Sequence, residues 1–231
     1  MAEVVPPEEF DWLAVGLAPA GSDRRHFVRE LVPVSYSRFV RILPPWLPGE
    51  DAGPATPRTW RELTDEAGLD FYPEVIAGEF KSAWRPGGDG VDLFCREDRE
   101  TRAPVVELLR RAAPGPYFFS WDLGAVIQMN VDPPVVVRSK AMDVDGATRT
   151  ASQLCRPERP CPNLQEPEHW WPVGREWVVS REYDLEQLYI ACGDDLADLL
   201  LADQRVEAVE VRPDSRVDWI VDEGRRRSGP G

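Results

Sequence analysis

The sequence holds 231 residues, of which 42% are hydrophobic and 29% charged, a composition that supports a folded core and excludes a disordered chain. Its 27 basic and 41 acidic residues leave a net charge of −14, which repels phosphate backbones and anionic membrane surfaces. We therefore expect no nucleic-acid or membrane partner, and a basic protein is the partner class that the charge favours.

Targeting signals and cysteines indicate the compartment. Residues 1–9 are acidic and proline-rich, and they lack the basic region and the apolar stretch of a signal peptide. No run of 18 or more apolar residues is present, and four cysteines in a chain of this length do not form a dense disulfide framework. We expect a cytoplasmic protein with reduced thiols; its oligomeric state is left open.

In chain order, the first predicted elements are three helices. A helix over 35–43 is predicted by apolar residues at i, i+3, i+4 and i+7, which are Tyr36, Phe39, Val40 and Leu43. A second helix is predicted with Thr56 as its N-cap and Pro57 as its first residue, and Gly68 ends it. A third spans 103–112 and closes with Arg110 and Arg111, the charge order that the helix dipole favours.

The second half of the chain predicts mostly strands. Residues 117–121 indicate a buried strand, and 135–142 with 147–154 form a predicted hairpin around Asp145-Gly146, a type I′ turn signal. A proline-rich loop follows over 155–168. The remaining predicted elements are strands at 177–180 and 206–211, extended structure near 188–191, and a helix at 194–203.

These elements predict the fold class α+β. Helices and strands are interleaved without a regular βαβ count, so we expect a single domain over 10–222, with a mixed or antiparallel sheet and about four helices. Residues 1–9 and 223–231 are expected to be flexible termini.

Motifs for chemistry are incomplete. Asp143 and Asp145 resemble half of a calcium loop, but Ala141 and Ser152 stand where its first and last acidic ligands belong. Four residues offer possible zinc ligands, yet their spacing fits poorly, and whether they come together is left open: Cys155, Cys161, His169 and Cys192. Serine-hydrolase and nucleotide-binding motifs are missing. We expect no metal, no cofactor and no catalytic residue, and enzymatic activity is disfavoured but left open.

Aromatic residues are the most distinctive pattern. Trp170, Trp171, Trp177 and Tyr189 lie within 20 residues of one another, and Trp121-Asp122 ends a predicted strand. Such residues line a ligand pocket or form an interface hot spot, or they simply fill the core. The candidate binding residues are Trp121, Asp122, His169, Trp170, Trp171 and Trp177.

Two resemblances to known families add expectations. Three blocks of the chain resemble those of a bacterial protein family with a WWP-x4-W-x-V motif and no assigned activity. They are segment 168–184 (EHWWPVGREWVVSREYD), the helix predicted within 33–43, and Trp121-Asp122. Cys192-Gly193 stands where that family has Gly-Gly. The resemblance covers about 33–211 and implies one shared domain. The P-x-x-Y start of the predicted helix and the acidic composition also resemble Smi1/Knr4-type immunity proteins, which neutralise toxins by binding.

The expected function follows from these patterns. We expect a non-enzymatic protein-binding factor, immunity-like or regulatory, with an acidic surface. The alternative is an enzyme or small-molecule-binding protein with an aromatic pocket around Trp121, Trp170, Trp171 and Trp177. A deep cavity with convergent polar groups would favour that alternative. A third hypothesis, a nucleic-acid mimic, requires acidic side chains aligned on one face.

Overall fold

The computed structural model describes residues 2–18, 27–48, 57–76, 93–95, 99–121, 134–153, 166–181 and 187–217. Its strands are β1 (Ala2–Val5), β2 (Arg38–Ile42), β3 (Trp46–Pro48), β4 (Leu93–Cys95), β5 (Tyr117–Trp121), β6 (Val135–Ser139), β7 (His169–Pro172), β8 (Trp177–Ser180), β9 (Leu188–Cys192) and β10 (Ala208–Val211). Its helices are the 3-10 turn η1 (Pro7–Phe10) and α1 (Asp11–Gly16), α2 (Val28–Leu31), α3 (Trp60–Glu66), α5 (Arg99–Ala112), α6 (Val144–Ser152) and α7 (Asp194–Ala202). None of these helices combines the length and the apolarity needed to cross a bilayer.

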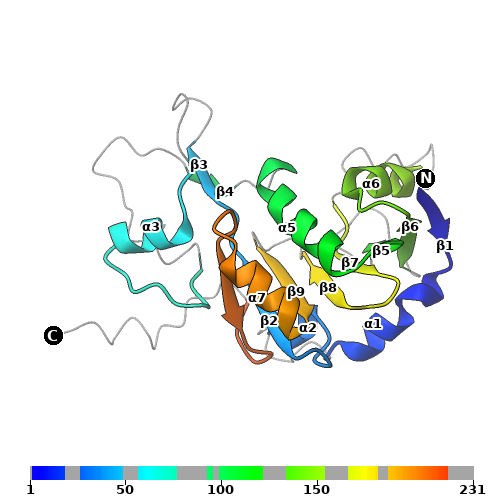
Figure 1. Ribbon diagram of the computed structural model, residues 1–231, viewed down its shortest axis with the longest axis horizontal. Helices are drawn as coiled ribbons and strands as arrows, with labels where there is room; N and C mark the ends of the chain where they lie inside the picture. Colours follow the sequence, from blue (N-terminus) through cyan, green and yellow to red (C-terminus); the bar gives the residue numbers. More distant parts are fainter. Residues whose placement is uncertain are drawn as a thin grey trace.

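Eight strands form one sheet in the order β1-β6-β5-β7-β8-β9-β2-β10 (Figure 1). Every neighbouring pair in it is antiparallel. Strands β3 and β4 pair separately, also antiparallel. The predicted class α+β is confirmed, with a fully antiparallel sheet, and the described residues hold six α-helices where about four were expected.

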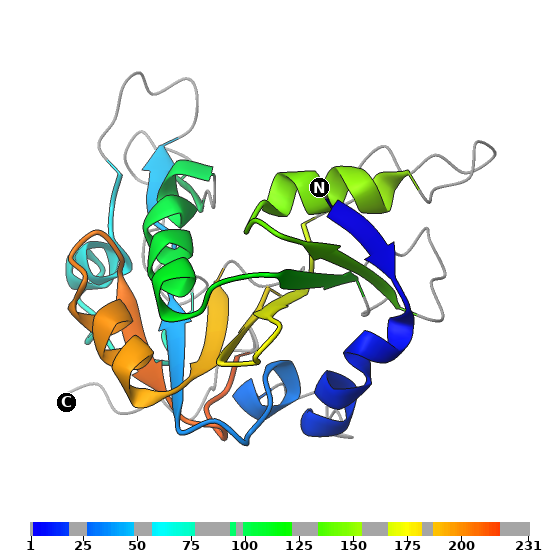
Figure 2. The ribbon, with the colours of Figure 1, turned by 45° about the vertical axis from the view of Figure 1, so that its right-hand side comes forward.

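Helices cover both faces of the large sheet. Figure 2 shows α5 and α6 on one face and α1 and α2 on the other. We call the first the α5–α7 face, because α7 also packs there against β2 and β10, and the second the N-terminal face. Because side chains alternate along a strand, each central strand supplies both cores. Along β5, for example, Phe119 packs on the α5–α7 face and Phe118 on the N-terminal face.

The helix predicted over 35–43 is wrong, because residues 38–42 form strand β2. This strand lies between β9 and β10, with Val40 paired to both Ile190 and Glu210. Val40 and Ile42 pack on the α5–α7 face, while Phe39 packs on the N-terminal face. A strand buried on both faces carries a nearly continuous apolar run, and such a run contains helical spacings by chance.

The hairpin predicted over 135–154 is correct only in its first strand. Residues 144–152 form helix α6, in which Ala147 and Ala151 are buried one turn apart. Asp143 is its N-cap and accepts a hydrogen bond from the Gly146 backbone N–H at 2.9 Å. A Cβ on Gly146 would lie 2.3 Å from the Asp143 Oδ2, so this glycine permits the close approach of the cap. The Asp-Gly signal therefore belongs to a helix start.

The N-terminus also differs from expectation. Residues 2–5 were expected to be flexible, yet they form edge strand β1, in which Val4 pairs with Val137. The 3-10 turn that follows buries Phe10. The predicted tail 223–231 lies outside the described residues, as does most of the predicted loop over 155–168.

The other elements agree with the sequence, with shifted ends. Helix α3 starts later than predicted, because Thr59 and Glu62 form a capping box, and Gly68 follows the helix with φ of +68°. Helix α5 begins at Arg99, four residues before the predicted start. Five further predictions are confirmed. The strands predicted at 117–121 and 177–180 are β5 and β8, and the extended residues 188–191 belong to β9. The strand predicted over 206–211 contains β10, and the helix predicted at 194–203 is α7.

Candidate functional site

The predicted aromatic residues lie in the core on opposite faces of the sheet. Trp121, Trp170 and Trp177 belong to the core of the α5–α7 face, whereas Trp171 belongs to the core of the N-terminal face. Each of the four side chains is at most 1% exposed. The sheet therefore divides them between two cores, the arrangement that the core-filling interpretation predicts. Asp122 lies outside the described residues.

The contacts of these tryptophans join strands to their neighbours. The Trp177 Nε1–H donates to the Leu109 carbonyl at 3.1 Å, which fastens β8 to α5. Its ring stacks on Tyr117 with centroids 6.1 Å apart. On the opposite face, the Trp171 ring stacks on Phe118 at 5.7 Å. These contacts give both residues structural roles.

His169 lies in a band of buried polar side chains that crosses the N-terminal face. Its Nε2 lies 2.9 Å from the Leu31 carbonyl oxygen, and since a carbonyl only accepts, this nitrogen is the donor. The band runs through neighbouring register positions on β5, β7, β8, β9 and β2, at Ser120, His169, Ser180, Tyr189 and Arg41. All five are at most 2% exposed, so the band is internal.

Arg41 ends this band and holds a neighbouring segment against the sheet. Its guanidinium donates to the Pro73 carbonyl at 2.6 Å and to the Val75 carbonyl at 2.7 Å. It also lies 5.4 Å from the centroid of the Trp60 ring in α3. The two terminal nitrogens of this buried arginine thus hold the carbonyls of residues 73 and 75 against the sheet.

The possible zinc ligands do not all come together. His169 lies on the N-terminal face and Cys192 in the core of the α5–α7 face, so the sheet separates them. Burial raises the pKa of the Cys192 thiol to about 12. Cys155 and Cys161 lie outside the described residues. Within the described ranges, no group of three or more histidine, cysteine or acidic side chains is arranged to hold a metal ion.

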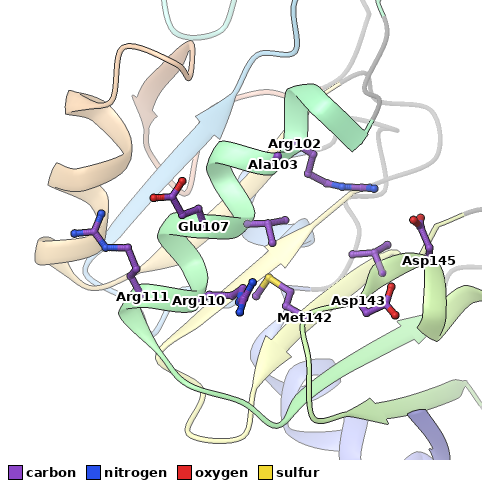
Figure 3. Close-up of a pocket in the computed structure, with 10 residues that line it drawn as sticks. Arg102, Ala103, Glu107, Arg110, Arg111, Met142, Asp143 and Asp145 are labelled. Atoms are coloured by element: carbon purple, nitrogen blue, oxygen red, sulfur yellow. The ribbon is translucent and has the colours of Figure 1, made fainter. Parts of the chain in front are cut away.

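A cleft between α5 and the start of α6 is the candidate site (Figure 3). Its volume of about 590 Å³ falls within the range of ligand pockets. The lining residues on α5 are Arg102, Ala103, Val106, Glu107, Arg110 and Arg111, and those at the start of α6 are Met142, Asp143, Val144 and Asp145. The cleft thus combines arginines, carboxylates and an apolar floor.

On the α5 wall, two of the charged side chains are compensated. Arg102 is 5% exposed and forms an ion pair with Glu166, which also lies 3.6 Å from Arg181. Glu107 accepts from Arg205 at 2.9 Å. Arg205 also bonds Asp203, and these bonds hold the pKa of the Asp203 carboxyl down at about 2.

Two arginines of the α5 wall remain, Arg110 and Arg111. Figure 3 shows the Arg110 side chain directed between the helices toward Met142, whereas Arg111 and Glu107 point to the other side of α5. Within the described residues, Arg110 forms no ion pair. The α5 wall therefore presents one uncompensated guanidinium to the cleft.

The α6 wall carries the opposite charge. Asp143 caps the helix through Oδ1, and its Oδ2 lies 4.0 Å from the exposed Arg149. Asp145 follows in the first turn, and Figure 3 shows both carboxylates on the α6 side of the cleft. Two acidic groups thus belong to the α6 wall of the cleft.

Sequence reasoning missed this cleft. Arg110 and Arg111 were interpreted as helix-end charges, and Asp143 and Asp145 as part of a turn. The available signal was Asp143 three residues before Gly146, followed by Ala147 and Ala151 at helical spacing, which identifies an N-cap. Nothing in the local pattern, however, indicates that α5 and α6 lie on the same face of the sheet.

Comparisons with protein-family models, with curated proteins and with solved structures found no match to this chain. The function is therefore inferred from the geometry and charge of the chain itself.

Proposed function

We propose that this protein is a non-enzymatic protein-binding factor that holds a segment of a basic partner protein in the cleft between α5 and α6. The observation that carries the proposal is the cleft itself, with a volume of about 590 Å³ between walls of opposite charge. An open cleft lined by charged and apolar side chains is suited to recognising a polypeptide, which offers both kinds of group.

The net charge supports a basic partner. A charge of −14 attracts a basic protein over several ångströms and raises the rate of encounter. The side chains of the cleft then select groups of the partner by direct contact.

The aromatic-pocket alternative has weaker support. Its four tryptophans are at most 1% exposed and are divided between two faces of the sheet, so they do not line a common cavity. A small molecule in the α5–α6 cleft is a distinct outcome, which a ligand-dependent rise in melting temperature without any captured protein would indicate.

A capture experiment tests the proposal. The purified protein is immobilised and exposed to a lysate of its source organism at low and high salt, beside the variant Arg110→Glu. The matched control is Arg212→Glu, which makes the same charge change at an exposed arginine beyond β10. We expect a basic protein that is retained at low salt, released at high salt, lost with Arg110→Glu and kept with Arg212→Glu. Equal retention by both variants, or none by the wild type, contradicts the proposal.

A further inference from the structure

Three exposed apolar side chains lie where the end of α1, the segment 33–36 and the turn between β7 and β8 meet. They belong to the five large hydrophobic side chains that are exposed in the described residues, and they are Val15, Val34 and Val173, at 87%, 51% and 55%. The end of α1 packs against the segment that carries Val34, since a Cβ on Gly16 would lie 3.0 Å from the Pro33 Cβ. We call this the valine surface. None of its residues lines the α5–α6 cleft.

Arg175 in the β7–β8 turn joins the parts of the valine surface. Its guanidinium lies 4.5 Å from the centre of the Trp12 ring in α1, and its carbonyl oxygen accepts from the Tyr36 hydroxyl at 2.8 Å. Trp12 and Tyr36 are half-buried, and Arg175 is exposed. Arginine, tryptophan and tyrosine are the residues that most often dominate the binding free energy of protein interfaces. The valine surface therefore adjoins side chains of the kind that anchor a protein partner.

The backbone of Arg175 is strained. Its φ of +58° lies in the left-handed region, which favours glycine. The glycine of this turn stands one position earlier, where a Cβ on Gly174 would overlap the Glu176 carboxylate. Within the described residues, the Arg175 guanidinium forms no ion pair and no hydrogen bond. Strained residues are concentrated at binding sites, and here the side chain ends in five N–H donors that are open to a ligand.

Acidic groups flank the valine surface. Asp11 lies one turn before Val15 on the exposed side of α1, and Glu176 lies in the β7–β8 turn. Glu8 and Glu9 precede α1 and are also exposed. These four carboxylates form no ion pair within the part of the chain that the structure describes. An apolar surface flanked by unpaired acidic groups is complementary to a partner that carries basic groups around apolar ones.

From these observations we infer that the valine surface docks a basic protein, whose apolar side chains cover the three valines and whose backbone carbonyls accept from Arg175. Basic side chains of the partner meet Asp11 and Glu176. The inference goes beyond the proposed function, because it assigns a second binding surface and does not depend on the cleft. A second copy of this chain offers apolar groups as well, but it carries the same charge of −14 and is repelled.

Site-specific photocrosslinking in the source organism tests the inference. The photoreactive residue p-benzoylphenylalanine takes the place of Val15 or Val173 in the full chain. The control position is Leu199 on α7, which is 41% exposed. Crosslinked proteins are identified by mass spectrometry. The experiment is repeated with Arg175→Gly, and its matched control is Arg212→Gly, which removes an exposed guanidinium beyond β10.

We expect positions 15 and 173 to crosslink to one and the same basic protein, and position 199 not to crosslink to it. Arg175→Gly removes the guanidinium but supplies the residue that this φ favours. Its crosslinking yield should therefore fall roughly tenfold, while its melting temperature stays within about 3 °C of the wild-type value. Arg212→Gly should change neither quantity. A merely structural role of Arg175 predicts an unchanged yield.

Four results overturn the inference. The first is the absence of crosslinks at both positions of the valine surface. The second is a crosslinked product that contains an acidic protein or two copies of this chain. The third is a yield that Arg175→Gly leaves unchanged, because the guanidinium then makes no contact with the partner. The fourth is an equal loss of yield with Arg212→Gly, which indicates an effect of overall charge and not of this surface.

Discussion

Replacing Arg41 with methionine tests whether the buried guanidinium holds the segment at 73–75 on the sheet. Methionine keeps the apolar stem, but the carbonyls of Pro73 and Val75 lose donors at 2.6 and 2.7 Å. The Val75 carbonyl is buried, and leaving it unsatisfied costs about 1–3 kcal/mol, while losing the part-buried bond to Pro73 costs about 0.5–1.5 kcal/mol. Part of this loss is offset, because the variant no longer buries a charged group. We expect the free energy of unfolding to fall by about 2–4 kcal/mol.

The assay is urea unfolding, followed by tryptophan fluorescence and circular dichroism. The matched control is Arg38→Met on the same strand, whose guanidinium pairs with Asp198 and Glu210 at the protein surface. Exposed ion pairs contribute little, so the control is expected to lose much less stability. Equal losses in the two variants, or an unchanged midpoint for Arg41→Met, would refute the anchoring role of Arg41.

Three further predictions concern other buried groups. Burial raises the pKa of Glu207, so its ionised form is disfavoured in the folded state. As pH rises above 4.5, the free energy of unfolding of the wild type should therefore fall relative to that of Glu207→Gln in pH-dependent urea titrations. The variant starts from a lower stability, because both carboxylate oxygens accept backbone N–H groups, from Trp60 and Arg61, and an amide has only one acceptor oxygen. Because burial raises the pKa of the Cys192 thiol to about 12, iodoacetamide at pH 8 should leave Cys192 unlabelled in the native protein, and rapid labelling seen by peptide mapping would contradict this. Trp177→Phe removes the indole donor from the Leu109 carbonyl, which keeps the Ala113 backbone N–H as a donor, so the lost hydrogen bond should cost about 0.5–1.5 kcal/mol in the same unfolding assay.

Local patterns predicted those elements whose sequence admits one interpretation. Strands β5 and β8 are short apolar runs, and α7 starts with two acidic residues and continues with leucines at helical spacing. Strand β2 was mistaken for a helix because burial on both faces removes the alternation that identifies a strand. Asp145-Gly146 was assigned to a turn because aspartate and glycine serve both in hairpin turns and at helix starts.

The cleft depends on information that no single segment carries. Its two walls come from α5 and α6, which the chain places on one face of the sheet by way of β5 and β6. The charges of Arg110 and Asp143 are visible in the sequence, but their opposition across a cavity arises only from that packing. The burial of the tryptophans was likewise undecided, since a bulky aromatic residue serves equally in a core and in a binding site.

The strand order has a consequence for synthesis on the ribosome. Strands β5 and β6 follow one another in the chain and pair as neighbours, as do β7, β8 and β9, whereas β1 and β2 emerge first and pair with strands made much later. Val4 cannot pair until Val137 has been synthesised, and Phe39 cannot pair until Ala191, near the end of the chain, has been synthesised. Such long-range pairing slows folding, and a nascent or truncated chain that ends before β9 exposes β2 as an unpaired strand able to associate with other chains.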